Sequence, residues 1–290
     1  MKISEQIRDY AKKMLEEGEV KQFIGFEKGR LPFHSTPVFI TEPGQVERLI
    51  WDDYCITNLS KYLVNFSHED GKTALVVKGC DSRGIVRLIQ DHQLQREKLV
   101  LIGIPCQGMK DSLRFFSKGD DSLLSPGGKC QSCTHPNPVL YDILIGEEVK
   151  SVNMDRFKKT EEIENLNIDE RYLYWSREFA RCIRCYACRN VCPACSCLSC
   201  YLDQHRVDWH GKDPAENASY LLTRAIHVAG RCIECGECAR VCPTGVSVME
   251  LNKKLIKDIN ELFGEQDAGV DFSQTHPLCQ YHTDDPDDFQ

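Results

Sequence analysis

The chain contains two copies of one cysteine pattern, and this repeat constrains the fold more than any other feature of its 290 residues. The first copy begins at Cys182 and the second at Cys232, and both read Cys-x2-Cys-x2-Cys-x3-Cys-Pro. This spacing is typical of [4Fe–4S] clusters, in which three thiolates of one run bind one cluster and the fourth binds the other. The repeat therefore predicts two neighbouring clusters that exchange their fourth ligands.

The exchange assigns a role to each of the eight cysteines. We expect cluster 1 to be bound by Cys182, Cys185, Cys188 and Cys242. We expect cluster 2 to be bound by Cys232, Cys235, Cys238 and Cys192. A pair of zinc sites is the alternative, but zinc commonly takes four ligands in two pairs. Each run here offers three closely spaced cysteines and a fourth before proline, which favours clusters.

The overall composition limits the cellular setting. The net charge is −8, which gives no indication of a nucleic-acid partner or an anionic membrane surface. No apolar run is long enough to span a bilayer, and residues 1–18 have the pattern of an amphipathic helix rather than a signal peptide. In a reducing compartment, the 17 cysteines indicate metal or redox chemistry rather than disulfides. We therefore expect a cytoplasmic protein.

The first half, residues 1–146, has the pattern of an α/β domain with a small parallel sheet. Two β-branched runs on either side of a helical segment predict a βαβ unit with parallel strands. The same half offers a short first strand, a long helix and a further strand near its end. The expected elements are strands at 38–40, 74–77, 99–102 and 141–145 and helices at 45–64 and 81–90.

The second half is expected to be mainly helical. A charged linker at 147–171 precedes a ferredoxin domain with two clusters at 172–264, and an acidic tail covers 265–290. Asp213 followed by Pro214 predicts the start of a helix that ends at Gly230. Ser247 predicts a second capped helix, which ends at Gly264. About forty residues separate Cys192 from Cys232, too many for a compact β-hairpin ferredoxin, since connections are usually short.

Four further cysteines predict a third site in the first half. Cys80 and Cys106 follow the two strands of the βαβ unit, so both belong at the carboxyl edge of the sheet, where open α/β sheets bind ligands. Cys130 and Cys133 arrive from the next loop. Together they supply four thiolate ligands, as a third [4Fe–4S] cluster requires. In the alternative, Cys80 and Cys106 are small buried apolar residues, and the other two form half of a zinc site.

The remaining cysteines are not needed by these three sites. Cys195, Cys197 and Cys200 directly follow the first motif. We expect them mostly to surround the cluster without binding it; an extended cluster environment and a partner's metal are the alternatives. Cys55 and Cys279 are expected to be structural or incidental.

Several of these segments resemble a known family. The stretches 76–84, 102–108 and 130–133, with Asp142 and Gly146, resemble the β subunits of F420-reducing hydrogenases and formate dehydrogenases. The stretch from Cys182 to Gly245 is similar to the two-cluster modules of sulfhydrogenase β subunits, anaerobic sulfite reductase A subunits and heterodisulfide-reductase-linked proteins.

The resemblance implies an iron–sulfur subunit that relays electrons between a catalytic subunit and a flavin or another carrier subunit. It also supports Cys80, Cys106, Cys130 and Cys133 as ligands, and it brings FAD into consideration as a further cofactor. The alternative is a flavoprotein that acts directly on a soluble carrier such as F420 or NAD(P). An iron–sulfur redox sensor is a third hypothesis, but no helix with a basic face for reading DNA is evident. No catalytic residue is predicted.

Overall fold

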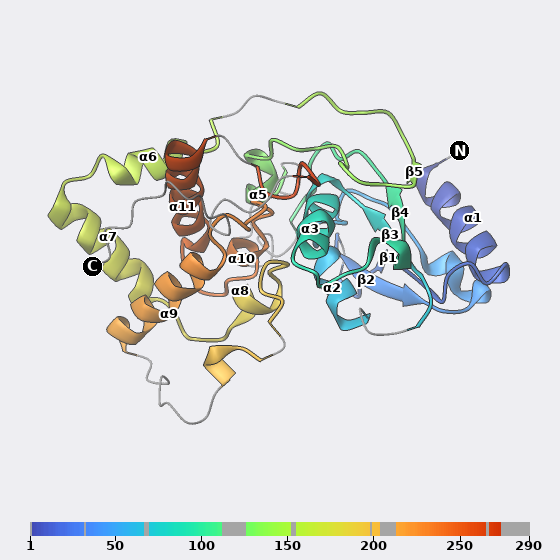
Figure 1. The fold of residues 1–290 in the computed structure, drawn as a ribbon, viewed down its shortest axis with the longest axis horizontal. Helices are drawn as coiled ribbons and strands as arrows, with labels where there is room; N and C mark the ends of the chain where they lie inside the picture. The colour runs from blue at the N-terminus through green and yellow to red at the C-terminus, as the bar shows by residue number, and fades with distance from the viewer. Residues whose placement is uncertain are drawn as a thin grey trace, which may run out of the picture.

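A computed structural model describes residues 2–31, 33–66, 70–111, 126–151, 155–197, 199–203, 213–264 and 267–273. The chain forms an α/β half and a helical half that lie side by side (Figure 1). The α/β half is built on a sheet in the order β2-β1-β3-β4-β5. Its strands are β1 (Gln22–Lys28), β2 (Ser35–Ile40), β3 (Thr73–Val77), β4 (Leu99–Gly103) and β5 (Ile143–Leu144).

The expected βαβ unit is present as β3, α3 (Gly79–Gln90) and β4. β3 pairs in parallel with β4, and β1–β3 and β4–β5 are also parallel. Every residue of β3 and β4 is buried, as is typical of parallel strands covered on both faces. The sheet as a whole is mixed, however, because β1 and β2 form an antiparallel hairpin, so the small parallel sheet predicted for this half is present only in part.

The prediction of one long helix at 45–64 is wrong. The segment instead contains η1 (Pro43–Arg48), an irregular stretch, α2 (Ser60–Leu63) and η2 (Val64–Phe66). The side chain of Asp52 accepts a hydrogen bond from Tyr54 N at 2.9 Å, and that of Asn58 accepts one from Ser60 N at 3.0 Å. Such local side-chain bonds compete with helix formation and stabilise turns.

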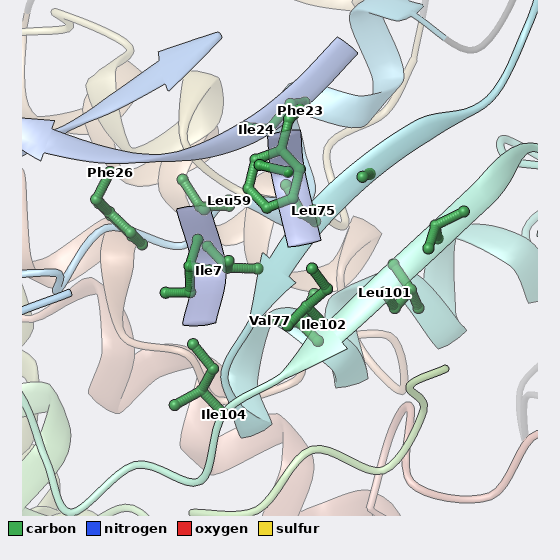
Figure 2. Packing of buried hydrophobic residues seen from close by; sticks show 14 of the residues in the cluster. Ile7, Phe23, Ile24, Phe26, Leu59, Leu75, Val77, Leu101, Ile102 and Ile104 are labelled. Atoms are coloured by element: carbon green, nitrogen blue, oxygen red, sulfur yellow. The ribbon is translucent and has the colours of Figure 1, made fainter. Parts of the chain in front are cut away.

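Helices cover the sheet on both sides. Figure 1 shows α1 (Ile3–Glu16) and α3 on opposite sides of the strands. The short helix η3 (Arg96–Lys98) directly precedes β4. Figure 2 shows Ile7 of α1 among the apolar side chains of the strands, including Phe23, Leu75 and Leu101. These residues are at most 1 % exposed, so the α/β half has a dry core of its own.

The second half is helical, as predicted. α7 packs against α9, α9 against α11, and α6 against α11. A separate apolar core gathers around Phe179, Leu221 and Ile256. The helices from 128 onward are α5 (Gly128–Gln131), α6 (Lys158–Glu164), α7 (Ile168–Ala180), α8 (Ala187–Asn190), η5 (Tyr201–Asp203), α9 (Pro214–His227), α10 (Glu237–Arg240) and α11 (Val248–Phe263).

The predicted helix starts had different outcomes. The Asp213 carboxylate accepts hydrogen bonds from Ala215 N at 2.8 Å and Glu216 N at 3.0 Å, so the cap of α9 is confirmed. The Ser247 side chain does not cap α11; its hydroxyl accepts a hydrogen bond from Tyr174 instead. α6 and the start of α7 lie within the 147–171 segment expected as a linker.

Residues 267–273 return to the α/β half. Arg83 Nε of α3 donates to the carbonyl of Ala268 at 3.1 Å, and Gln90 Nε2 donates to the carbonyl of Asp271 at 3.0 Å. The rest of the predicted acidic tail, 274–290, lies outside the described residues, as does Cys279. Among the helices that the structure describes, none is both long and apolar enough to cross a membrane.

Candidate iron–sulfur sites

The two cysteine loops repeat in three dimensions as well as in sequence. Arg184 and Tyr186, on either side of Cys185, have φ angles of 57° and 59°. Glu234 and Gly236, on either side of Cys235, have φ angles of 55° and 66°. Non-glycine residues rarely adopt this left-handed conformation, and where they do a local constraint usually holds them there. The shared backbone shape shows that both loops wrap in the same way around their cysteines.

Each loop brings its cysteines toward the last cysteine of the other loop. Burial raises the pKa of Cys182, and the nearby sulfurs of Cys188 and Cys242 raise it further. Burial likewise raises the pKa of Cys232, and the sulfurs of Cys192 and Cys238 add to the shift. The sulfurs of Cys182, Cys188 and Cys242 thus lie near one another, and so do those of Cys192, Cys232 and Cys238.

The chemistry of these thiols fits a metal cluster. Burial raises the pKa of Cys238 to about 12, so the free thiol keeps its proton at neutral pH. Coordination removes such a proton, because a metal-bound thiol is deprotonated. No three His, Cys, Asp or Glu side chains of the described residues converge on a single metal ion. In a cubane each thiolate binds a different iron, so its ligands need not converge in that way.

A buried arginine that the sequence analysis missed lies between the two loops. Arg224 of α9 is 4 % exposed, and its Nη2 donates to the carbonyl of Cys188 at 3.1 Å. Its Nε and Nη1 have no hydrogen-bond partner among the residues that the structure describes. Burial alone would lower its pKa, but the surrounding cysteine sulfurs, Cys192 and Cys238 foremost, raise it instead. A negatively charged cluster on either side would offset the buried charge of Arg224 and accept hydrogen bonds from its Nε and Nη1.

Asn252 of α11 is a second missed residue. It is 2 % exposed, and its Nδ2 lies 3.8 Å from Cys232 Sγ and 3.9 Å from Cys238 Sγ. Hydrogen bonds to cluster sulfurs are one of the ways in which a protein raises the reduction potential. Both residues had a sequence signal, since each lies three or four positions from buried apolar residues of its helix, Tyr220 and Leu221 in α9 and Met249 and Ile256 in α11.

The four cysteines of the expected third site line one cavity of about 140 Å³. Cys80 lies in the first turn of α3, and Cys106 follows β4, so both lie at the carboxyl edge of the sheet as predicted. Cys130 belongs to α5, and Cys133 follows it. Burial raises the pKa of Cys106 to about 11, so this thiol also needs a metal in order to ionise at neutral pH.

The protein holds this edge of the sheet firmly. Lys78 Nζ and Asp81 Oδ2 form a fully buried ion pair at 2.8 Å across the turn that carries Cys80. Asp81 also accepts a hydrogen bond from Leu59 N at 2.6 Å. Gly79 leaves no room for a side chain, because a Cβ there would lie 2.0 Å from the carbonyl oxygen of His135. These contacts fix the position of Cys80 before any cofactor binds.

The third cavity adjoins the second motif. Cys235 lies on its wall together with the four cysteines of the first half. Lys129, next to Cys130, forms a buried ion pair with Glu237 of α10 and donates to the carbonyl of Ile56 at 2.7 Å. Burial alone would lower the pKa of Lys129, but Glu237 and the nearby sulfurs of Cys80, Cys130 and Cys235 together outweigh burial and raise the pKa. The two sites therefore share a wall and a buried ion pair.

The remaining cysteines separate into two groups. Cys55 is fully buried in the α/β core beside Asp52, which agrees with a structural role. Cys195, Cys197 and Cys200 line another cavity, of about 720 Å³, between the two halves of the chain. Thr57, Lys61 and Tyr62 of the first half belong to the same lining.

Comparison with known proteins places this geometry in a class. Residues 178–246 match a family model described as a 4Fe-4S dicluster domain, so the helical half carries a domain that binds two [4Fe–4S] clusters. The match includes both cysteine motifs.

Three quarters of the chain is similar to the β subunits of two formate dehydrogenases. It is 24 % identical over 304 aligned positions to the F420-dependent formate dehydrogenase 1 subunit beta of Methanococcus maripaludis, covering 75 % of this chain and 78 % of that protein. It is 21 % identical to the F420-dependent formate dehydrogenase subunit beta of Methanocaldococcus jannaschii, with coverages of 75 % and 79 %. The dicluster domain is less than a quarter of the chain, so the similarity also extends beyond it. The resemblance to an iron–sulfur β-subunit family is thereby confirmed.

Proposed function

We propose that this chain is the iron–sulfur subunit that relays electrons within a cytoplasmic oxidoreductase complex of the formate dehydrogenase or hydrogenase type. The observation that carries the proposal is the wall shared by the third cavity and the second motif, with Cys235 on it. A protein that only stores clusters has no need to bring two sites together in this way. A relay does, because electrons pass between carriers that are close to one another.

The ligand sets follow the grouping of the cysteines. Cys182, Cys185, Cys188 and Cys242 would hold cluster 1, and Cys232, Cys235, Cys238 and Cys192 would hold cluster 2. Cys80, Cys106, Cys130 and Cys133 would hold a third cluster at the carboxyl edge of the sheet. A [4Fe–4S] cluster supplies a one-electron carrier at each of these sites.

The residues around the thiolates set the environment of the carriers. Arg224 places a buried positive charge beside cysteines of both motifs, which favours the reduced, more negative form of the clusters. Asn252 directs its amide toward two sulfurs of the second motif. Cys238 and Cys192 are buried, whereas Cys185 and Cys133 are exposed, so cluster 1 and the third cluster would each have a ligand open to a partner.

The partners follow from the relatives, whose names mark them as subunits of formate dehydrogenases. We expect a catalytic dehydrogenase or hydrogenase subunit on one side, and a flavin or heterodisulfide-reductase-like subunit on the other. The proposed units are an α/β domain at 1–146, a linker at 147–171, a two-cluster ferredoxin domain at 172–264 and an acidic tail at 265–290.

A second candidate is a flavin-containing oxidoreductase that acts directly on F420 or NAD(P). The cavity of about 720 Å³ favours it, since ligand pockets commonly measure about 300–1,000 Å³. Acid precipitation of the anaerobic protein separates the two candidates. Free FAD in the supernatant supports the second, and a supernatant without flavin rejects it.

The relay itself is tested by reduction of the chain under anaerobic conditions. Formate alone should leave the visible absorbance of the chain unchanged, and dithionite should bleach it. Formate together with the catalytic subunit of a formate dehydrogenase of the matched type should bleach it as fully as dithionite does. Bleaching by formate without that subunit contradicts a purely relaying role, and so does failure of formate dehydrogenase and hydrogenase catalytic subunits alike to reduce the chain.

A further inference from the structure

We propose that Cys195, Cys197 and Cys200 bind a fourth iron–sulfur cluster on the wall of the cavity between the two halves. The inference builds on the proposed function, because it adds a carrier to the same electron-transfer protein. The twelve cysteines assigned above leave these three thiols without a ligand role.

The three thiols gather at one place. All of them line the cavity of about 720 Å³, together with Lys61 of α2 and Arg189 of α8. Cys195 and Cys200 are partly buried, and Cys197 is exposed. The segment that carries them begins directly after Cys192, the buried cysteine assigned to cluster 2. The new site would therefore adjoin Cys192 and the cluster assigned to it.

The charges of the cavity suit a negatively charged group. Lys61 donates to the carbonyl of Cys195. Burial lowers the pKa of Lys61, and the nearby sulfurs of Cys195, Cys192 and Cys197 act in the opposite direction. Arg189 interacts with the sulfur of Cys200 and with Asp203.

The carboxylates of the same lining are already neutralised. Asp203 pairs with Arg189 at 2.8 Å, and Glu237 pairs with Lys129 and with Arg240, the latter at 2.7 Å. Lys61 pairs with no carboxylate of the described residues, so this cation is available to offset the negative charge of a thiolate-bound cluster, as cations near such clusters do.

The spacing favours a cluster over a single ion. No three potential ligands of the described residues close on one metal ion, and this holds equally for the residues of the dicluster motifs. A zinc ion would need four ligands about 2.0–2.3 Å away. In a cluster three thiolates bind three different irons. The fourth iron is left for His227, which lines the same cavity, or for a solvent oxygen.

Iron and acid-labile sulfide per chain test this site, measured on protein purified under strictly anaerobic conditions. Four clusters predict about sixteen iron atoms in the wild type and about twelve in Cys197→Ser/Cys200→Ser. Cys279→Ser is the matched control and should keep the wild-type count. Cys195 is left unchanged, because its sulfur interacts with that of Cys192.

The same iron measurements distinguish failure of the fourth site from failure of the proposed function. Equal iron in the wild type and in Cys197→Ser/Cys200→Ser overturns the fourth site, and released flavin in that case assigns the cavity to a flavin. If the double variant does not fold, the iron of the wild type is quantified by Mössbauer spectroscopy instead. About twelve iron atoms per chain in the wild type, with a loss of about four in Cys130→Ser/Cys133→Ser, would overturn the fourth site. Unchanged iron in Cys130→Ser/Cys133→Ser rejects the third cluster of the proposed function instead.

Discussion

Lys129 and Glu237 form a buried ion pair that joins the cysteine loop of the α/β half to the second motif of the helical half. Glu237 also accepts hydrogen bonds from Arg240, at 3.0 and 2.7 Å. Burial alone would raise the pKa of Glu237, but the two cations outweigh it and lower the pKa to about 2. The carboxylate therefore stays ionised, although its side chain is only 1 % exposed.

Removing this carboxylate should be costly. Glu237→Gln leaves two buried cations without their partner and should destabilise the protein by about 3–5 kcal/mol, the range for broken buried pairs. Lys129→Met should cost less, because Arg240 still pairs with Glu237. The readout is the urea midpoint at which the anaerobic protein loses its visible absorbance. Asp53→Asn, which breaks a pair whose carboxylate is 65 % exposed, is the control and should leave the midpoint unchanged.

The pH dependence of this effect follows from the lowered pKa of Glu237. The stabilisation is complete above the ordinary glutamate pKa of 4.5 and is lost as the pH falls toward the lowered pKa of about 2. The difference in midpoint between the wild type and Glu237→Gln should therefore stay constant from about pH 5 to about pH 8. A difference that shrinks within that interval contradicts the assignment.

Arg224 should raise the reduction potentials of the dicluster domain through its charge. Arg224→Leu should lower them by on the order of 60 mV, a tenfold change for a one-electron couple. Arg224→Lys keeps the charge and should stay near the wild type. Redox titration followed by EPR gives the potentials. An equal shift in both variants would show that packing, not charge, is responsible.

Asn252 should act on one cluster only. Its amide lies near Cys232 and Cys238, both assigned to cluster 2. Asn252→Leu should therefore lower the potential of cluster 2 and leave that of cluster 1 unchanged, which makes cluster 1 the internal control. Equal shifts of both potentials in the same titration would refute a local hydrogen-bond effect.

Gly236 and Gly245 provide a matched pair of glycine substitutions. Both have a φ angle of 66°, so alanine costs about 1–2 kcal/mol of backbone strain at either position. A Cβ at Gly236 would also lie 2.5 Å from Lys129 Cβ, whereas nothing lies within 4 Å of one at Gly245. Gly236→Ala should lower the thermal midpoint more than Gly245→Ala does, and equal shifts would contradict this close approach between the two halves.

Removal of the metal should affect the two halves differently. Five assigned ligands, Cys182, Cys188, Cys232, Cys238 and Cys242, belong to the helical core or pack against it, whereas only Cys106 and Cys130 pack against the larger α/β core over the sheet. Anaerobic chelation should therefore unfold the helical half, because metal binding and folding are coupled in such sites. Far-UV circular dichroism should lose helical signal and keep that of the sheet. A spectrum unchanged by loss of iron would contradict the prediction.

The sequence was most informative where spacing determines chemistry. The two motifs predicted the dicluster domain, and the β-branched runs around α3 predicted parallel strands that place Cys80 and Cys106 at one edge. Asp213 and Pro214 predicted the start of α9 because capping depends only on local residues.

Features that depend on tertiary packing were missed. The hairpin of β1 and β2 was not expected, and the turns around Asp52 and Asn58 were read as helix because their apolar neighbours follow a helical period. The pair between Lys129 and Glu237 spans 108 residues, so no local pattern indicates it. Arg224 and Asn252 lie on buried faces of their helices, but only the fold brings them to the cysteines.

We propose that the α/β half holds an electron carrier of its own, the third cluster, beside the dicluster domain. Iron per chain, compared between the wild type and Cys130→Ser/Cys133→Ser after anaerobic purification, tests it most directly. The variant should lose about four iron atoms per chain, which is one [4Fe–4S] cluster, and should retain the EPR signals of the dicluster domain. An unchanged iron content would contradict it and leave the cavity around Cys80 and Cys106 without a role in electron transfer.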